Sequence, residues 1–154
     1  MGFAKTALSK HDKPIRVVSI HDTDLDRSMM DVDTYAKSRD PAHLHLKGDD
    51  ESPPVWFTLR PMDRDEIVQI FSEAASPNRA VQEVFRQACI EIKNLMMTQD
   101  GKTFPINARR EVLPGNMRRL DDLTAGLVPI VIQRELGLLV CEWSKLDDET
   151  RKNS

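Results

Sequence analysis

Histidines and aspartates gather in the first third of the sequence, where they could form a metal site. The group comprises His21, Asp22, Asp24, Asp26, His43 and His45. Imidazole and carboxylate groups suit zinc, manganese or iron. However, the sequence has no helical His-Glu-x-x-His pair, and these carboxylates do not match a calcium-binding loop. A solvated turn and an alternating surface strand fit the pattern better than a metal site, so we expect no metal or other cofactor.

Two cysteines are the remaining candidates for chemistry. Cys89 falls inside one apolar stripe and Cys141 beside another, where a thiol behaves as a small hydrophobic group of raised pKa. The sequence lacks a Gly-x-Ser-x-Gly elbow, a Walker loop and a dinucleotide fingerprint. We therefore expect no enzymatic activity. A metal-dependent hydrolase using the region of His21 and His45 is the alternative of a different class.

Aromatic and arginine side chains indicate protein binding instead. Arginine and aromatic residues dominate protein interfaces, and free strand edges accept added strands. The candidate protein-binding residues are Trp56, Arg60, Arg109, Arg110, Arg118 and Arg119. For Trp56, packing beneath a helix is the competing interpretation.

Nucleic acid is not the expected partner of these arginines. The chain has 25 acidic and 22 basic residues and a formal charge of −3, so it offers no broad positive field for a phosphate backbone. Only Phe104 lies near the arginines to stack on a base. A solvated loop, or a charged patch for an acidic protein partner, fits this region better.

Chain length and composition predict one globular domain. A chain of 154 residues is long enough to bury a hydrophobic core. The start of the sequence lacks the apolar stretch of a secretory signal, and the cysteines lie far apart, which favours a reducing compartment. Residues 127–143 are the most apolar segment, but charged residues interrupt it. It therefore reads as a buried core helix and not as a membrane span.

Short strands are expected in the N-terminal third. The β-branched segment 14–20, the alternating segment 43–47 and the segment 54–61 are the strand candidates, with a helical turn at 31–39 between the first two. In the third strand, Phe57 and Leu59 share one face with Val55. Prolines at both ends of that strand suggest an edge strand or a short sheet.

Three main amphipathic helices are expected to follow and to form the core. Asp63 and Glu66 form a capping box that starts the first helix. The second begins after Pro77, and the third begins between Thr124 and Pro129 and ends near Lys145. The three apolar stripes are Ile67, Ile70, Phe71 and Ala74; Val81, Val84, Phe85, Ala88, Cys89, Ile92 and Met96; and Val128, Val131, Ile132, Leu136, Leu139, Val140 and Trp143.

The expected fold class is therefore α+β within a single domain spanning residues 1–154. Residues 99–119 hold several prolines and glycines and five basic residues, so we expect a long loop with at most a short hairpin. Residues 1–12 and 147–154 read as polar arms.

Part of the sequence resembles small proteins of tailed-phage tail modules, closest in layout to tail assembly chaperones. The resemblance covers about residues 54–154: the strand 54–62, the capped helix start 64–67, a long loop, the segment 134–137 of a closing helix, and the polar ending 142–154. It implies a non-enzymatic morphogenesis factor of the host cytoplasm that oligomerises and coats the tape measure protein while tail tube subunits polymerise.

A structural virion component is the alternative within the same gene neighbourhood. Such a head–tail or tail adaptor subunit would bind connector or tail tube subunits and remain in the virion. Under either interpretation the chain acts by protein–protein binding, and we expect neither nucleic acid nor a membrane as a partner.

Overall fold

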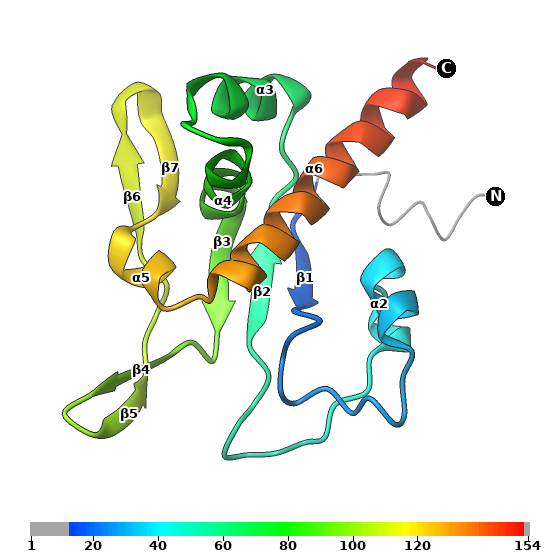
Figure 1. Ribbon diagram of the computed structural model, residues 1–154, viewed down its shortest axis with the longest axis vertical. Helices are drawn as coiled ribbons and strands as arrows, with labels where there is room; N and C mark the ends of the chain where they lie inside the picture. Colours follow the sequence, from blue (N-terminus) through cyan, green and yellow to red (C-terminus); the bar gives the residue numbers. More distant parts are fainter. Residues whose placement is uncertain (1–12, 153–154) are drawn as a thin grey trace.

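The protein has a mixed α+β fold built on small antiparallel sheets (Figure 1). The computed structural model describes residues 13–152, and the side chains of residues 13–145. The elements are β1 (Ile15–Val18), α2 (Val32–Ser38), the 3-10 turn η1 (Pro41–His43), β2 (Trp56–Leu59), α3 (Arg64–Glu73), α4 (Pro77–Ala88), β3 (Cys89–Lys93), β4 (Met96–Gln99), β5 (Lys102–Pro105), β6 (Arg110–Leu113), the 3-10 turn η2 (Pro114–Asn116), β7 (Met117–Leu120), α5 (Asp122–Gly126) and α6 (Ile130–Lys152).

The main sheet has the order β1-β2-β3, with both pairings antiparallel. Of the two interpretations of the flanking prolines, the edge position was wrong, because β1 and β3 pair with the two sides of β2. The alternative, a short sheet, is confirmed by three strands of four or five residues. Pro54 and Pro61 lie just outside the paired residues, so neither removes a ladder hydrogen bond. The predicted alternation is confirmed: Phe57 and Leu59 are buried, whereas Trp56 is half-buried on the other face.

The core lies where α4 and α6 pack against one face of this sheet (Figure 1). Phe57 meets Phe85 of α4 edge to face, with 5.9 Å between ring centroids. The stripes predicted for these two helices are largely correct. Their fully buried members are Val84, Phe85, Ala88, Cys89, Leu136 and Val140. Three predicted core positions were wrong, because Phe71 of α3, Met96 of β4 and Val131 of α6 are 40%, 40% and 51% exposed.

Helices α4 and α6 approach each other closely at Gly137. A Cβ atom on Gly137 would lie 2.2 Å from the carbonyl oxygen of Val81 and 2.8 Å from its Cγ1. The missing side chain therefore lets the backbone of α4 approach α6 directly.

The second helix is shorter than predicted. Helix α4 ends at Ala88, and the chain enters β3 at Cys89 without a loop. Ile92 is buried as expected, but from a strand that pairs with Phe57. Met96 begins the exposed strand β4. Pairing with β2 outweighs the helical periodicity that the apolar residues also satisfied.

Two hairpins occupy the segment predicted as a long loop. In β4–β5, Asp100 and Gly101 both have positive φ, as the tight turn of a two-residue hairpin requires. Hairpin β6–β7 turns at Gly115 and packs along α4. In Figure 1 the two hairpins lie on the same side of the molecule, opposite α2.

A buried polar cluster ties the N-terminal segment to α6. The Glu135 carboxylate pairs with Arg39 at 3.0 Å, and these side chains are only 8% and 4% exposed. Glu135 also accepts hydrogen bonds from Ser19 Oγ and the Ile20 amide. Arg39 donates to the Val18 carbonyl, and its guanidinium lies over the Tyr35 ring. The charges are therefore buried with partners, as they must be at low dielectric.

Other expectations were met only in part. Segment 43–47 forms no extended strand: η1 covers its start, and Leu46 makes a single bridge to Leu25. The third helix is divided into α5 and α6, and α6 continues to Lys152 through most of the predicted C-terminal arm. Residues 1–12 and 153–154 lie outside the described residues.

Within residues 13–152, no helix combines the length and the apolar character needed to cross a membrane.

Candidate functional site: a groove between α3 and the β6–β7 hairpin

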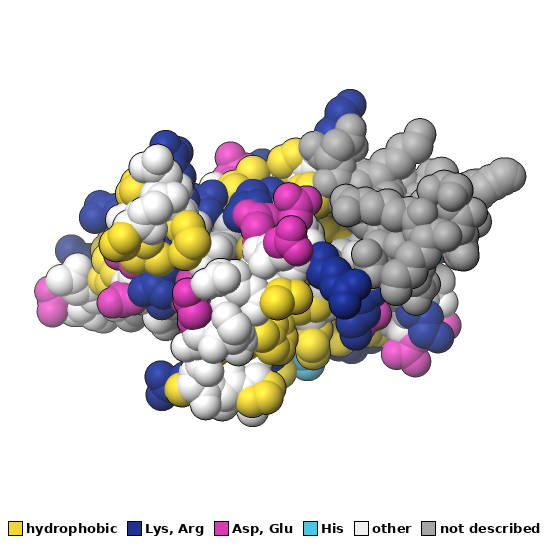
Figure 2. Space-filling view, turned by 90° about the horizontal axis from the view of Figure 1, so that it is seen from above, with side chains coloured by type: hydrophobic (Ala, Val, Ile, Leu, Met, Phe, Trp, Pro, Cys, Tyr) yellow, Lys and Arg dark blue, Asp and Glu magenta, His cyan; other side chains and the backbone are white. Residues whose placement is uncertain are grey.

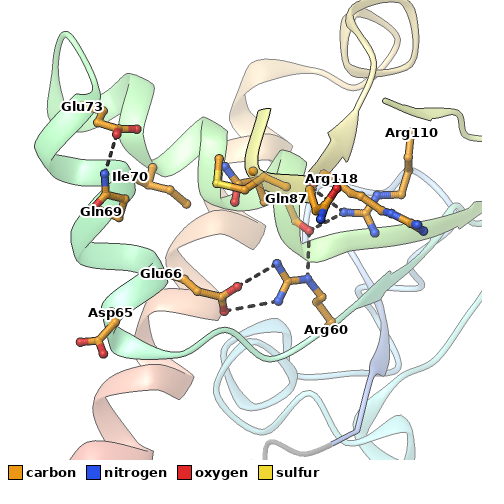
Figure 3. A pocket seen from close by; sticks show the side chains of 12 residues that line it. Arg60, Asp65, Glu66, Gln69, Ile70, Glu73, Gln87, Arg110 and Arg118 are labelled. Atoms are coloured by element: carbon orange, nitrogen blue, oxygen red, sulfur yellow. Dashed lines mark hydrogen bonds and ion pairs between the residues drawn. The ribbon is translucent and has the colours of Figure 1, made fainter. Parts of the chain in front are cut away.

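A groove of about 680 Å³ runs between α3 and the β6–β7 hairpin (Figure 3). We call it the arginine groove, because three of the predicted binding residues, Arg60, Arg110 and Arg118, line it. Its other lining residues are Asp65, Glu66, Gln69, Ile70, Glu73, Gln87, Gly115, Asn116 and Met117. The sequence therefore predicted the arginines of this groove. For the residues of the α3 wall it predicted a capped helix but no binding role.

Arg60 follows directly after β2 and spans the floor of the groove. Its Nε donates to the Gln87 carbonyl at 3.2 Å, and its two terminal nitrogens lie 3.3 and 3.4 Å from the Glu66 carboxylate. Both side chains are partly exposed, at 30% and 40%. The contacts with Glu66 are long for an arginine–carboxylate pair, which normally closes to about 2.7–2.9 Å.

Arg110, at the start of β6, meets Arg60 at the same acceptor. Its Nη2 donates to the carbonyls of Gln87 and Arg118, each at 2.8 Å, while its buried Nε has no hydrogen-bond partner among the described residues. Burial, followed by the charge of Arg60, lowers the pKa of Arg110. Two guanidinium groups thus converge on a carbonyl oxygen at the C-terminal end of α4, where the helix dipole favours cations.

The two walls of the groove differ in charge. Arg118 is exposed on β7, and neither Arg118 nor Arg110 has a carboxylate within ion-pair distance in the described part of the chain. On the α3 wall, Glu66 engages Arg60, Glu73 accepts a hydrogen bond from Gln69, and Asp65 points away from the arginines (Figure 3). Figure 2 shows acidic and basic groups side by side at this end of the molecule, and hydrophobic side chains on the same face.

The groove continues along the hairpin into a second hollow of about 310 Å³. Ile70 and Met117 line both parts, and Leu113 and Ala74 line the second. Met117 is 38% exposed, and Val112 on the hairpin is 63% exposed. An extended segment lying here would meet arginines at one end. Further along it would meet apolar side chains, with Glu73, Arg79, Glu83 and Arg119 around them.

The remaining predicted binding residues do not line the arginine groove itself, although Arg119 lines the second hollow. Arg119 fastens the hairpin to α4: it pairs with Glu83 at 2.6 Å and with Glu111 at 2.8 Å. Burial alone would lower the pKa of Arg119, but the Glu111 hydrogen bond and Glu83 outweigh it and raise that pKa. Arg109 is exposed outside the groove. Trp56 belongs to the central strand of the main sheet. The Arg16 guanidinium lies over its ring, with 5.0 Å between the guanidinium carbon and the ring centroid.

The residues of α4 that hold this hairpin were not among the predicted binding residues. Arg86 donates two hydrogen bonds to the Leu120 carbonyl and pairs with Asp122 at 2.8 Å. Gln87 supplies the carbonyl shared by Arg60 and Arg110. Both residues flank the apolar stripe of α4, and that was the only signal in the sequence that they could face another element.

The aspartates considered for a metal site hold turns together. Asp22 accepts hydrogen bonds from the amides of Asp24 and Val55, and Asp24 accepts one from Asp49. Asp26 binds Ser28, whereas His43 contacts Ser38. Among residues 13–152, no three His, Cys, Asp or Glu side chains are arranged to hold a metal ion.

The two cysteines differ in environment, and both are free thiols. Burial raises the pKa of Cys89 to about 12, and it raises the pKa of the half-buried Cys141 as well. Neither environment favours the nucleophilic thiolate.

No family model, curated protein or solved structure matched this chain in the three comparisons made.

Proposed function

We propose that this protein is a non-enzymatic binding protein that holds a segment of a protein partner in the arginine groove. The observation that supports this most directly is the convergence of Arg60, Arg110 and Arg118 on one groove. Beside them lies an apolar strip that includes Ile70 and Met117. A concave surface with a few placed polar groups is the usual form of a binding site. Arginines with an exposed apolar neighbourhood are typical of binding hot spots.

The resemblance of residues 54–154 to tail-module proteins indicates which partners to test first. We propose a tail assembly chaperone-like role in phage morphogenesis, with the tape measure protein as the client and with self-association of the chain. The alternative is a head–tail or tail adaptor subunit that binds connector or tail tube subunits. The first role belongs to the host cytoplasm and the second to the virion.

Site-specific cross-linking tests the groove. A photo-reactive amino acid replaces Met117, inside the groove, or Leu123, which is 49% exposed on α5 and outside it. Each variant is co-expressed with the tape measure protein or a tail tube subunit from the same genome. We expect a specific adduct from position 117 and little from position 123. Equal adducts from both positions, or none from position 117, would refute the groove as the binding surface.

Purified virions distinguish the two roles. A chaperone releases its client, whereas a structural subunit stays in the particle. Abundant peptides of this chain in mature virions would overturn the chaperone role. Absence from virions together with co-purification of the tape measure protein would overturn the adaptor role.

A further inference from the structure

The arginine groove is lined by three arginines and three carboxylates, but only one of these carboxylates pairs with an arginine in the part of the chain that the structure describes. Arg60, Arg110 and Arg118 face the groove, and Glu66 is the sole carboxylate in ion-pair distance of any of the three within the described residues. An anionic group beside these guanidinium groups would pair with the charge that Glu66 leaves unmatched.

We infer that the groove recognises an acidic segment of the protein partner, with one partner carboxylate bound between Arg60, Arg110 and Arg118. This inference rests on the proposed protein-binding function and specifies its chemistry. Arginine forms paired hydrogen bonds with carboxylates, and a partly desolvated site strengthens them. The apolar side chains of Ile70 and Met117 add a second requirement, so the segment carries apolar residues beyond its acidic ones.

Glu66 acts as an internal competitor for this carboxylate. It holds Arg60 through contacts of 3.3 and 3.4 Å while remaining 40% exposed, so it is easily displaced. Glu66 also accepts a hydrogen bond from the Asp63 amide at 2.9 Å as part of the capping box of α3. Glutamine serves equally at this capping position. The substitution E66Q therefore removes the competing charge while retaining the cap.

Fluorescence anisotropy with three labelled octapeptides tests the inference on the full chain. Each peptide joins a run of glutamate, glutamine or lysine to a run of leucine. We expect saturable binding of the glutamate peptide, about tenfold weaker binding in R118E and several-fold tighter binding in E66Q. R109E is the matched control, because Arg109 is an exposed arginine of the same segment outside the groove. It should leave binding nearly unchanged, and thermal melting should show that all variants are folded.

Several outcomes would overturn the inference. These are equal binding of the glutamine peptide, equal losses in R118E and R109E, weaker binding in E66Q, or no binding of any peptide. Tighter binding of a single-stranded oligonucleotide, with the same loss in R118E, would assign the arginines to nucleic acid instead. If the cross-link at position 117 forms while the glutamate peptide fails to compete with it, the protein-binding function stands and the acidic specificity falls.

Discussion

Helix α4 makes two different kinds of attachment on its two sides. Toward α6 it presents Ala80, Val81 and Val84, which are almost completely buried. Toward the β6–β7 hairpin it presents Glu83 and Arg86, which form ion pairs and hydrogen bonds with partly exposed partners. The stability of the α4–α6 contact comes from apolar packing. The contact between α4 and the hairpin relies on charge–charge interactions, which dissolved salt weakens by screening. The hairpin, and with it one wall of the arginine groove, is therefore the more adjustable part of the molecule.

The largest expected effect concerns the other contact of α6, the buried polar cluster that ties it to the N-terminal segment. Changing Glu135 to Ala leaves the Arg39 guanidinium buried without its partner. We expect the free energy of unfolding to fall by about 3–5 kcal/mol, the usual cost of breaking a buried pair. Urea denaturation measures the loss. The control E142A on the same helix removes an exposed carboxylate whose contact with Lys145 is 3.4 Å long, and it should cost little. Similar results for E135A and E142A would contradict the importance of the buried cluster.

The next effect addresses the contact between α4 and α6 directly. A methyl group at Gly137 would overlap the Val81 carbonyl, so G137A must move the helices apart. We expect a loss of about 2–3 kcal/mol in the free energy of unfolding, measured by thermal or urea denaturation. Gly126, where an added Cβ meets no atom within 4 Å, provides the control, and G126A should be neutral or slightly stabilising. Unchanged stability in G137A would show that the close approach is not required.

On the hairpin side, R119A removes the link between β7, Glu83 and Glu111. Because Arg119 is 21% exposed, we expect a loss of only about 1–2 kcal/mol, concentrated in faster amide hydrogen exchange of β6–β7. In wild type, added salt should speed the same exchange while leaving that of α4 and α6 nearly unchanged. R109A is the control with an exposed arginine. If amide hydrogen exchange in R119A became faster throughout the core and not mainly in β6–β7, the hairpin would not open independently of the rest of the protein.

The smallest effect uses the cysteines as reporters of the two environments. At pH 8 a thiol reagent should modify the half-buried Cys141 readily and Cys89 only after unfolding. The folded protein raises the pKa of Cys89 from about 9 to about 12, so the stability this thiol contributes is present below pH 9 and lost as the pH rises toward 12. At pH 10 the loss is about 1 kcal/mol. C89A should flatten this part of the pH profile of the free energy of unfolding. Rapid modification of native Cys89 would contradict its burial.

Local signals in the sequence predicted the elements whose determinants are local. The capping box at Asp63 and Glu66 and the alternation of Phe57 and Leu59 both appear as predicted. The extent of α4 was wrong, because residues 89–93 satisfy a helical and a strand pattern equally and only pairing with β2 decides between them. The same dependence on distant partners explains the wrong edge assignment of β2.

The candidate site was predictable only in part for a similar reason. Arg118 and Arg119 are neighbours in β7, yet Arg118 lines the arginine groove and Arg119 pairs with Glu83 of α4. Neighbouring residues of a strand point to opposite faces, so composition alone could not separate these roles. The burial of Arg39 with Glu135 joins distant parts of the chain and left no local signal.

The direct junction between α4 and β3 has a consequence for the lengths that this chain can tolerate. Ala88 ends the helix and Cys89 begins the strand. Because no loop lies between them, the faces that the side chains of α4 point to are fixed relative to the two faces of β3. One residue inserted within α4 would rotate its N-terminal part by about 100° relative to β3, because an α-helix has about 3.6 residues per turn. The register already shifts beside this junction, where Leu59 pairs with Cys89 and Thr58 with Glu91, which leaves Ile90 as a single bulged residue. The protein should therefore tolerate insertions and deletions in the hairpin turns, whereas those within residues 77–93 should destabilise the fold.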